Sequence, residues 1–178
     1  DGGFSESLNT TEPIKVLGMY DESNVRLVEA AMTKRGITNK FARHAILSVM
    51  GKESGGLKRL TEKCWGGSDK EYSRALRKFS MFRNTSAWSK EDVIDLMSDC
   101  RKWFNTIYGS EGNVFANRPG TDDGYNYRGR GFNQITGRSW YRSMQRKSGY
   151  SLLSDPDMLT DFDIAADVGV VFLNYVIE

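Results

Sequence analysis

Glu53 is the first residue whose type and position could serve acid–base chemistry. It lies near the end of a helical pattern, and at about 100° per residue it shares a narrow sector with Ala42, Ile46 and Val49. If this sector faces the core, a carboxylic acid buried there holds its proton at the working pH, as a general acid requires. The alternative is a charged helix end that extends into solvent past Gly55-Gly56, and spacing alone favours it.

A second carboxylic acid, Glu62, follows nine residues after Glu53. The Gly55-Gly56 pair interrupts the helix, so the chain can turn back and place the two carboxyl groups on opposite sides of a groove. Two groups so placed can hydrolyse a glycosidic bond as an acid and a base. Taken alone, Glu62 beside Lys63 is typical of a solvated surface charge. The competing acids for the second role are Asp69, Glu71, Asp122 and Asp123.

Residues 127–137 form the third candidate and read Tyr-Arg-Gly-Arg-Gly-Phe-Asn-Gln-Ile-Thr-Gly. Gly129 and Gly131 permit a positive φ or a close backbone approach. The alternation predicts a short extended segment in which Gln134 and Thr136 point the same way, offering an amide and a hydroxyl to a sugar or a water. The segment lacks the Gly-Lys-Ser/Thr ending of a phosphate-binding loop. The alternative is a basic loop with incidental polar residues.

Together these motifs resemble those of the family 19 glycoside hydrolases, in particular the chitinase-like endolysins and virion lysins of bacteriophages. The resemblance covers roughly residues 40–175, in the same order and at similar intervals. The Arg-Gly-Arg-Gly…Gln-x-Thr-Gly-Arg signature is specific, whereas Glu-Ser-Gly-Gly alone is weak. The residues that carry the resemblance are Glu53-Ser-Gly-Gly, Glu62, 123–131, Gln134-Ile-Thr-Gly-Arg138 and 153–159.

The resemblance implies a mainly α, lysozyme-like fold with a small irregular or β-hairpin segment flanking the substrate groove. It implies a general acid at Glu53, a general base at Glu62, and a role for Thr136 in holding the attacking water. It also implies a substrate contact by Gln134. To substrate binding we further assign Arg130 and two aromatic residues, Tyr127 and Trp140, with Trp65 and Tyr125 as further candidates for stacking on sugar rings.

Three departures from the family pattern affect the groove. Trp140 stands where these lysins usually have an Asn that touches the sugar, which predicts a changed subsite preference. Residues 63–67, Lys-Cys-Trp-Gly-Gly, differ from the usual Asn- and Tyr-containing loop. An Asn-Gly-Gly segment typical near the family's C-terminus is missing before Glu178, so the chain is either a trimmed version or a part of a longer domain.

The predicted function is therefore peptidoglycan degradation by an inverting glycosidase, with carboxyl groups separated by roughly 6.5–9.5 Å. Peptidoglycan is favoured over chitin because the resemblance is to phage lysins and because the disulfides usual in plant chitinases cannot form here. The alternatives are a chitinase, a lytic transglycosylase that uses Glu53 alone and leaves a 1,6-anhydro end, and a non-catalytic glycan-binding relic. No cofactor and no metal is expected. The expected partner is the glycan strand of the bacterial cell wall, in the periplasm or at the cell surface. Delivery from the host cytoplasm or from the virion, within a larger tail-associated protein, stays open.

The elements that must position these residues are helices joined by short loops. Apolar residues at three-to-four spacing predict helices over 21–36, 39–54, 68–82, 89–109 and 138–147, and a buried central helix from about residue 161. Residues 110–137 lack a helical period and leave room for a small hairpin within 112–136. We expect an extended lead-in or linker over 1–20 and one catalytic domain over 21–178.

Composition excludes several classes of protein. The 178 residues, 39% hydrophobic and 27% charged, suit one globular domain rather than a disordered chain. A net charge of +2 predicts no nucleic-acid partner, and no apolar stretch approaches the roughly 20 residues of a membrane helix. The start at Asp1 without Met indicates a processed product or an excised domain. Cys64 and Cys100 are expected to be ordinary thiols, with pairing as the alternative.

Overall fold

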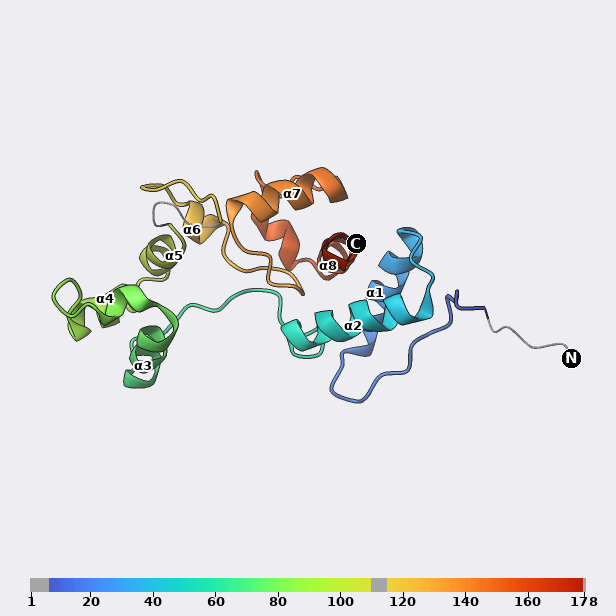
Figure 1. Cartoon of the computed structure of the whole chain (residues 1–178), viewed down its shortest axis with the longest axis horizontal. Helices are drawn as coiled ribbons and strands as arrows, with labels where there is room; N and C mark the ends of the chain where they lie inside the picture. The colour runs from blue at the N-terminus through green and yellow to red at the C-terminus, as the bar shows by residue number, and fades with distance from the viewer. Residues whose placement is uncertain (1–6, 110–114, 178) are drawn as a thin grey trace, which may run out of the picture. The chain divides into compact units, whose positions relative to one another are not determined.

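The computed structural model describes residues 7–109 and 115–177, and these are mainly α-helical, as predicted. The chain divides into two compact units, each described here by itself (Figure 1). Unit 1 comprises the residues up to Thr61, Gly129–Ile135 and the residues from Tyr141 onward; unit 2 comprises Glu62–Arg128 and Thr136–Trp140. The single catalytic domain over 21–178 stays a prediction.

Unit 1 is built around helix α8 (Phe162–Ile177), which packs against α1 (Glu22–Lys34), α2 (Lys40–Ser54) and the 3-10 helix η2 (Pro156–Thr160). The middle of α8 is buried from Ala165 to Val170, which confirms the predicted buried helix. Before α1, the described residues 7–20 form no helix but pack onto this unit, where Ile14 is buried and its N–H donates to the Glu29 carboxylate.

Both ends of α2 follow from its sequence and confirm the predicted bounds. The Asn39 side chain accepts hydrogen bonds from the N–H groups of Phe41 and Ala42, so it caps the helix start. At the other end Gly55 and Gly56 have φ of +63° and +79°. A Cβ at Gly56 would lie 2.3 Å from the Met19 carbonyl oxygen, so only glycine fits there. Glu53 is thereby fixed in the last turn of the helix.

The core-facing side of α2 differs from the prediction. Its buried residues include Ile46, Leu47 and Met50, whereas Val49 and Glu53 are exposed. The core face is therefore rotated away from the predicted stripe: Glu53 does not lie on the buried side, and it forms the exposed helix end that spacing alone favours. The core face also buries Arg43, whose guanidinium donates to the Ile37 carbonyl and the Thr33 hydroxyl.

Unit 2 contains α3 (Asp69–Lys78), η1 (Ser80–Arg83), α4 (Lys90–Ser98), α5 (Cys100–Tyr108) and α6 (Asp123–Asn126). Its core is aromatic: the Trp103 ring stacks on Phe82 at 5.4 Å and lies 5.0 Å from Trp65. The predicted helix over 68–82 continues from α3 into η1. The predicted single helix over 89–109 is two helices, because the Asp99 carboxylate accepts from the Lys102 N–H and caps a new helix.

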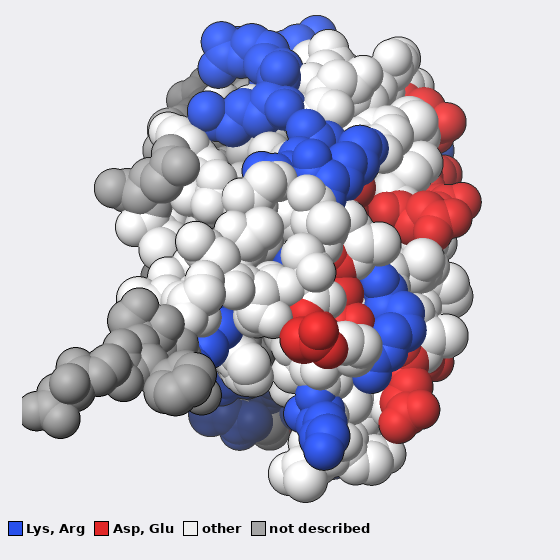
Figure 2. Space-filling view, turned by 90° about the vertical axis from the view of Figure 1, so that its right-hand side faces the viewer, with Lys and Arg blue, Asp and Glu red and all other residues white. Residues whose placement is uncertain are grey.

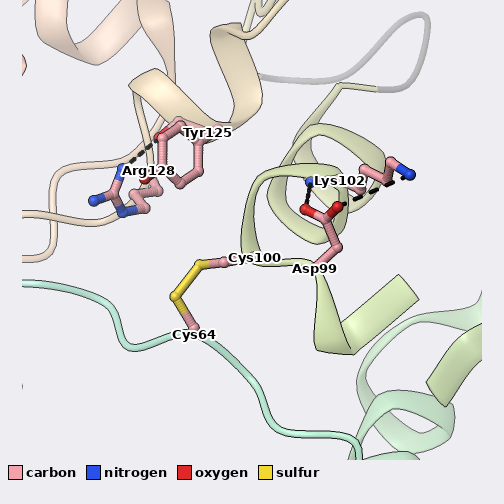
Figure 3. Close-up of a disulfide and its surroundings, with 6 residues drawn as sticks. All are labelled: Cys64, Asp99, Cys100, Lys102, Tyr125 and Arg128. Carbon is pink, nitrogen blue, oxygen red and sulfur yellow. Dashed lines mark hydrogen bonds and ion pairs between the residues drawn. A yellow bond between two sulfur atoms is a disulfide. The ribbon is translucent and has the colours of Figure 1, made fainter. Parts of the chain in front are cut away.

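A disulfide joins Cys64 to Cys100, the first residue of α5, so the expectation of two ordinary thiols is wrong (Figure 3). Their Cα atoms lie 5.3 Å apart across a sequence separation of 36 residues. Closing a loop of this length in the unfolded chain stabilises the folded protein by about 3–4 kcal/mol. The disulfide thus ties the chain to α5 at Cys64, two residues after Glu62.

The irregular region holds less β-structure than predicted. Among the described residues it shows isolated bridges instead of a hairpin: Arg130 pairs with both Thr61 and Ile135. Residues 131–134 form a tight turn, and Gly131 has a φ of +78°, as its position in the motif predicted. Part of the predicted hairpin, residues 112–114, lies outside the described residues. Helix α7 (Arg138–Ser148) begins in unit 2, and its residues from Tyr141 on belong to unit 1.

Asp167 ties α8 to α1 within unit 1. Its buried carboxylate accepts from the Arg35 guanidinium at 2.8 Å, the Lys34 ammonium at 3.0 Å and the Tyr150 hydroxyl at 2.9 Å. Burial alone would raise the pKa of Asp167, but the hydrogen bonds from Arg35, Lys34 and Tyr150 outweigh it and lower the pKa to about 2.

We expect Asp167 to make unit 1 acid-sensitive. Because the folded pKa lies below the unfolded value, the ionised carboxylate stabilises the fold by about 2 kcal/mol above pH 4 and loses this as the pH falls toward 2. Urea unfolding between pH 2 and 6 should show a shallower acid dependence for Asp167→Asn than for the wild type. Asp163→Asn, which changes an exposed residue of the same helix, is the control. An unchanged acid dependence in Asp167→Asn would contradict the assignment.

Candidate functional site

Glu62 is held by a neighbour in unit 2 rather than left in solvent. Its carboxylate accepts a hydrogen bond of 2.8 Å from the Tyr108 hydroxyl at the end of α5. The Tyr108 ring is itself fixed, because it stacks on Phe104 at 5.9 Å and meets Phe115 edge-on at 5.3 Å. Burial and the nearby Glu62 charge both raise the pKa of Tyr108, so its hydroxyl remains a donor at any neutral pH.

The segment that carries Thr136 is tied to the same framework of unit 2 through the two residues that follow it. The next two residues are tied down, since the Gly137 N–H donates to the Tyr127 carbonyl and the Arg138 N–H to the Asn117 side-chain oxygen. The other end of the buried Asn117 amide donates to the Tyr108 carbonyl at 2.9 Å. A chain of hydrogen bonds and covalent linkage therefore runs from the Glu62 carboxylate through Tyr108 and Asn117 to Arg138 at the start of α7, two residues after Thr136.

Glu53 lies in the other unit, exposed in the last turn of α2. The next residue, Ser54, is buried and fixes the turn: its hydroxyl donates to the Met50 carbonyl and accepts from the Leu57 N–H. A general acid must be reachable by its substrate, and an exposed carboxyl on a fixed turn meets that condition. The argument from burial does not hold, and the role of Glu53 rests on the motif. Its separation from the Glu62 carboxyl stays a prediction.

Gln134 does not lie on the extended segment that the alternation predicted. It occupies the tight turn in unit 1 with a φ of +50°, and its side-chain amide donates to the Gly131 carbonyl at 3.0 Å. The prediction of an extended segment is wrong here because a tight turn reverses the chain direction between Arg130 and Ile135. Gln134 remains partly exposed, so its predicted contact with substrate stays open to test.

Two residues assigned to substrate binding are buried. Arg130 is 3% exposed, forms an ion pair with Asp157 of η2 at 3.0 Å and donates to the Tyr141 hydroxyl, which ties the turn to unit 1. Tyr127 is 7% exposed at the end of α6. Neither presents its side chain to solvent, so the prediction that Tyr127 offers a ring face and Arg130 a charge to a glycan is not supported. The ion pair and hydrogen bond of Arg130 indicate a structural role for this residue of the motif.

The remaining aromatic candidates differ in exposure. Trp140 is partly exposed in the first turn of α7, as a sugar platform requires. Trp65 is instead 6% exposed in the aromatic core, with the Arg74 guanidinium over its ring, so it offers no stacking face. Tyr125 is partly exposed, but its ring faces two guanidinium groups, from Arg101 at 5.2 Å and Arg128 at 4.3 Å. Figure 3 shows the second of these, with Arg128 beside the Tyr125 ring.

The acids that compete with Glu62 each have a cationic partner. Asp123 is buried. Burial alone would raise its pKa, but the hydrogen bonds from Arg118 outweigh this effect and lower the pKa below its usual value. This carboxylate accepts from both the Arg118 backbone and side chain, which marks it as structural. The other pairs are Asp69 with Lys90, Glu71 with Arg74, and Asp122 with Arg101. Asp122 also lines a pocket of about 520 Å³ with Lys102 and Thr106.

The charge distribution matches the small net charge. On the face in Figure 2, basic and acidic side chains both reach the surface, so neither sign dominates it. Within residues 7–109 and 115–177, no group of three or more His, Cys, Asp or Glu side chains is arranged to hold a metal ion. None of the helices in this part of the chain combines the length and apolar character that spanning a membrane needs.

Sequence reasoning missed Tyr108 and Asn117, the two residues that link the Glu62 and Thr136 segments. Tyr108 carries one signal, its spacing of four residues from Phe104 on the buried side of α5. Asn117 carries none, because its partners Tyr108 and Arg138 lie 9 and 21 residues away along the chain. Neither a protein-family model nor a curated protein matches the chain.

Proposed function

We propose that this chain is a peptidoglycan-degrading glycosidase related to the family 19 glycoside hydrolases and that it inverts the cleaved β-1,4 bond. In this mechanism Glu53 donates a proton to the glycosidic oxygen, and that bond breaks with the electron pair passing to the leaving sugar. Ionised Glu62 takes a proton from a water that attacks the anomeric carbon from the opposite ring face, and Thr136 orients this water. Gln134 and Trp140 contact the glycan.

The observation that carries the proposal is the framework from Glu62 through Tyr108 and Asn117 to the segment of Thr136. A base and the residue that orients its water must be held in a fixed relation, because small displacements slow the reaction strongly. A solvated surface charge needs no such support. The mainly helical fold and the exposed Glu53 are consistent with the proposal, and the disulfide supports action in an oxidising compartment such as the periplasm or cell surface.

We expect the reducing end released from purified peptidoglycan to be the α-anomer. Inversion follows from attack by water on the face opposite the leaving group, in a single displacement. Proton NMR of oligosaccharides, recorded within minutes of digestion, resolves α- and β-anomers before they interconvert. Digestion of chitin oligomers in parallel tests the substrate class.

The other outcomes each point to a different mechanism. Initial release of the β-anomer indicates retention and excludes Glu62 as a base that activates water in a single displacement. A 1,6-anhydro end indicates a lytic transglycosylase that uses Glu53 alone. Glycan binding without release of any new end indicates a non-catalytic relic. Faster turnover of chitin oligomers than of peptidoglycan reassigns the substrate.

A further inference from the structure

Helix α5 holds the Glu62 segment at two points. Its first residue, Cys100, forms the disulfide with Cys64, two residues after Glu62, and its last residue, Tyr108, donates to the Glu62 carboxylate at 2.8 Å. Figure 3 shows the first of these points, where the extended segment carrying Cys64 passes the start of α5. One rigid helix thus limits both the path of the backbone and the direction of the carboxylate.

We propose that Tyr108 is a positioning residue for the general base: its hydroxyl holds the Glu62 carboxylate in the orientation needed to take a proton from the attacking water. This inference rests on the proposed function. Tyr108 touches neither substrate nor the water, and it acts only through Glu62. A carboxylate has two oxygens, and the hydroxyl engages Oε1 at 2.8 Å. Fixing one oxygen removes rotations of the side chain that would otherwise have to be frozen when Glu62 takes the proton from the water.

The surroundings of Tyr108 suit a fixed donor. Its ring stacks on Phe104 and meets Phe115 edge-on, and its carbonyl accepts from Asn117. The charged groups near the hydroxyl are Glu62 itself and Arg74 on α3. Because the ring is held by contacts that a phenylalanine also makes, Tyr108→Phe removes the hydroxyl and leaves the packing in place.

The test is a double-mutant cycle on a defined oligosaccharide with Tyr108→Phe and Glu62→Gln. We expect Tyr108→Phe to lower kcat by about tenfold with KM unchanged, because Glu62 takes the proton from the attacking water only in the transition state. In the Glu62→Gln background the same change should cause no further loss, since there is no base left to orient. Tyr72→Phe is the matched control: Tyr72 also packs against the aromatic core of unit 2, and its ring contact with Lys90 survives the change.

Each other result overturns the inference in a recognisable way. Wild-type kcat in Tyr108→Phe shows that the hydroxyl orients nothing. An equal loss in both backgrounds, together with a lower melting temperature than the Tyr72→Phe control, shows a structural role. If the wild-type chain releases no reducing ends at all, the proposed function fails and this inference fails with it, whereas an active wild type with an unaffected Tyr108→Phe variant removes the inference alone.

Discussion

Glu53→Gln is expected to abolish clearing of a peptidoglycan suspension, with a loss of at least about 10²–10⁴-fold in turnover. The amide has nearly the same shape as the carboxylic acid but cannot donate a proton at a useful rate, and general acid catalysis contributes a factor of this size. The leaving sugar then departs as an unprotonated alkoxide. Turbidity loss and release of reducing ends, followed over several hours, measure the effect.

The fold should survive this change. Glu53 is exposed in the last turn of α2, where the helix dipole disfavours a negative charge, so a neutral side chain is tolerated there. Its melting temperature should stay within about 2 °C of the wild type. Glu22→Gln makes the same chemical change at an exposed helical position of unit 1 and should keep full activity. Near-wild-type clearing by Glu53→Gln would remove Glu53 from the mechanism.

The parts of the fold that sequence predicts well are those set by local chemistry. Asn39 and Gly55 cap α2 because a side-chain acceptor and a left-handed residue are required within a few residues of the helix ends. Asp99 shows the limit of the same argument. Apolar spacing continues from α4 into α5, whereas the cap made by this carboxylate ends one helix and begins another. The spacing of apolar residues indicates which side chains are buried, whereas the Asp99 cap sets the point at which one helix ends and the next begins.

The face of α2 and the contacts of the candidate site depend on residues far along the chain. Val49 and Ile46 are equally suited to a core, and tertiary contacts decide that Ile46 is buried and Val49 exposed. The Cys64–Cys100 pair and the Glu62–Tyr108 contact link residues 36 and 46 positions apart, and no local pattern encodes either. Arg130 shows a second limit of sequence reasoning. The motif predicts that its charge contacts substrate, whereas in the structure it forms an ion pair with Asp157 of the same unit.

Glu62→Gln and Trp140→Ala are expected to separate catalysis from binding. A general base acts on water in the transition state, so its loss should lower kcat by about 10²–10⁴-fold and leave glycan affinity nearly unchanged. The Trp140 ring, partly exposed in the first turn of α7, would contact the sugar in ground and transition states alike. Its removal should therefore chiefly raise KM. Steady-state kinetics on a defined oligosaccharide, beside calorimetric binding and thermal melts, measures all three quantities.

The competing acids provide the controls for this experiment. Glu71→Gln changes a partly exposed carboxylate of unit 2 that pairs with Arg74, and it should leave kcat intact. If Glu62→Gln keeps the wild-type kcat, the base is not Glu62, and Asp69, Glu71 and Asp122 become the next variants to make. Asp123 is the weakest of these competitors because its buried carboxylate is already engaged by Arg118. If Trp140→Ala lowers the melting temperature without changing KM, this ring is part of the packing of the chain and the glycan platform must be sought elsewhere.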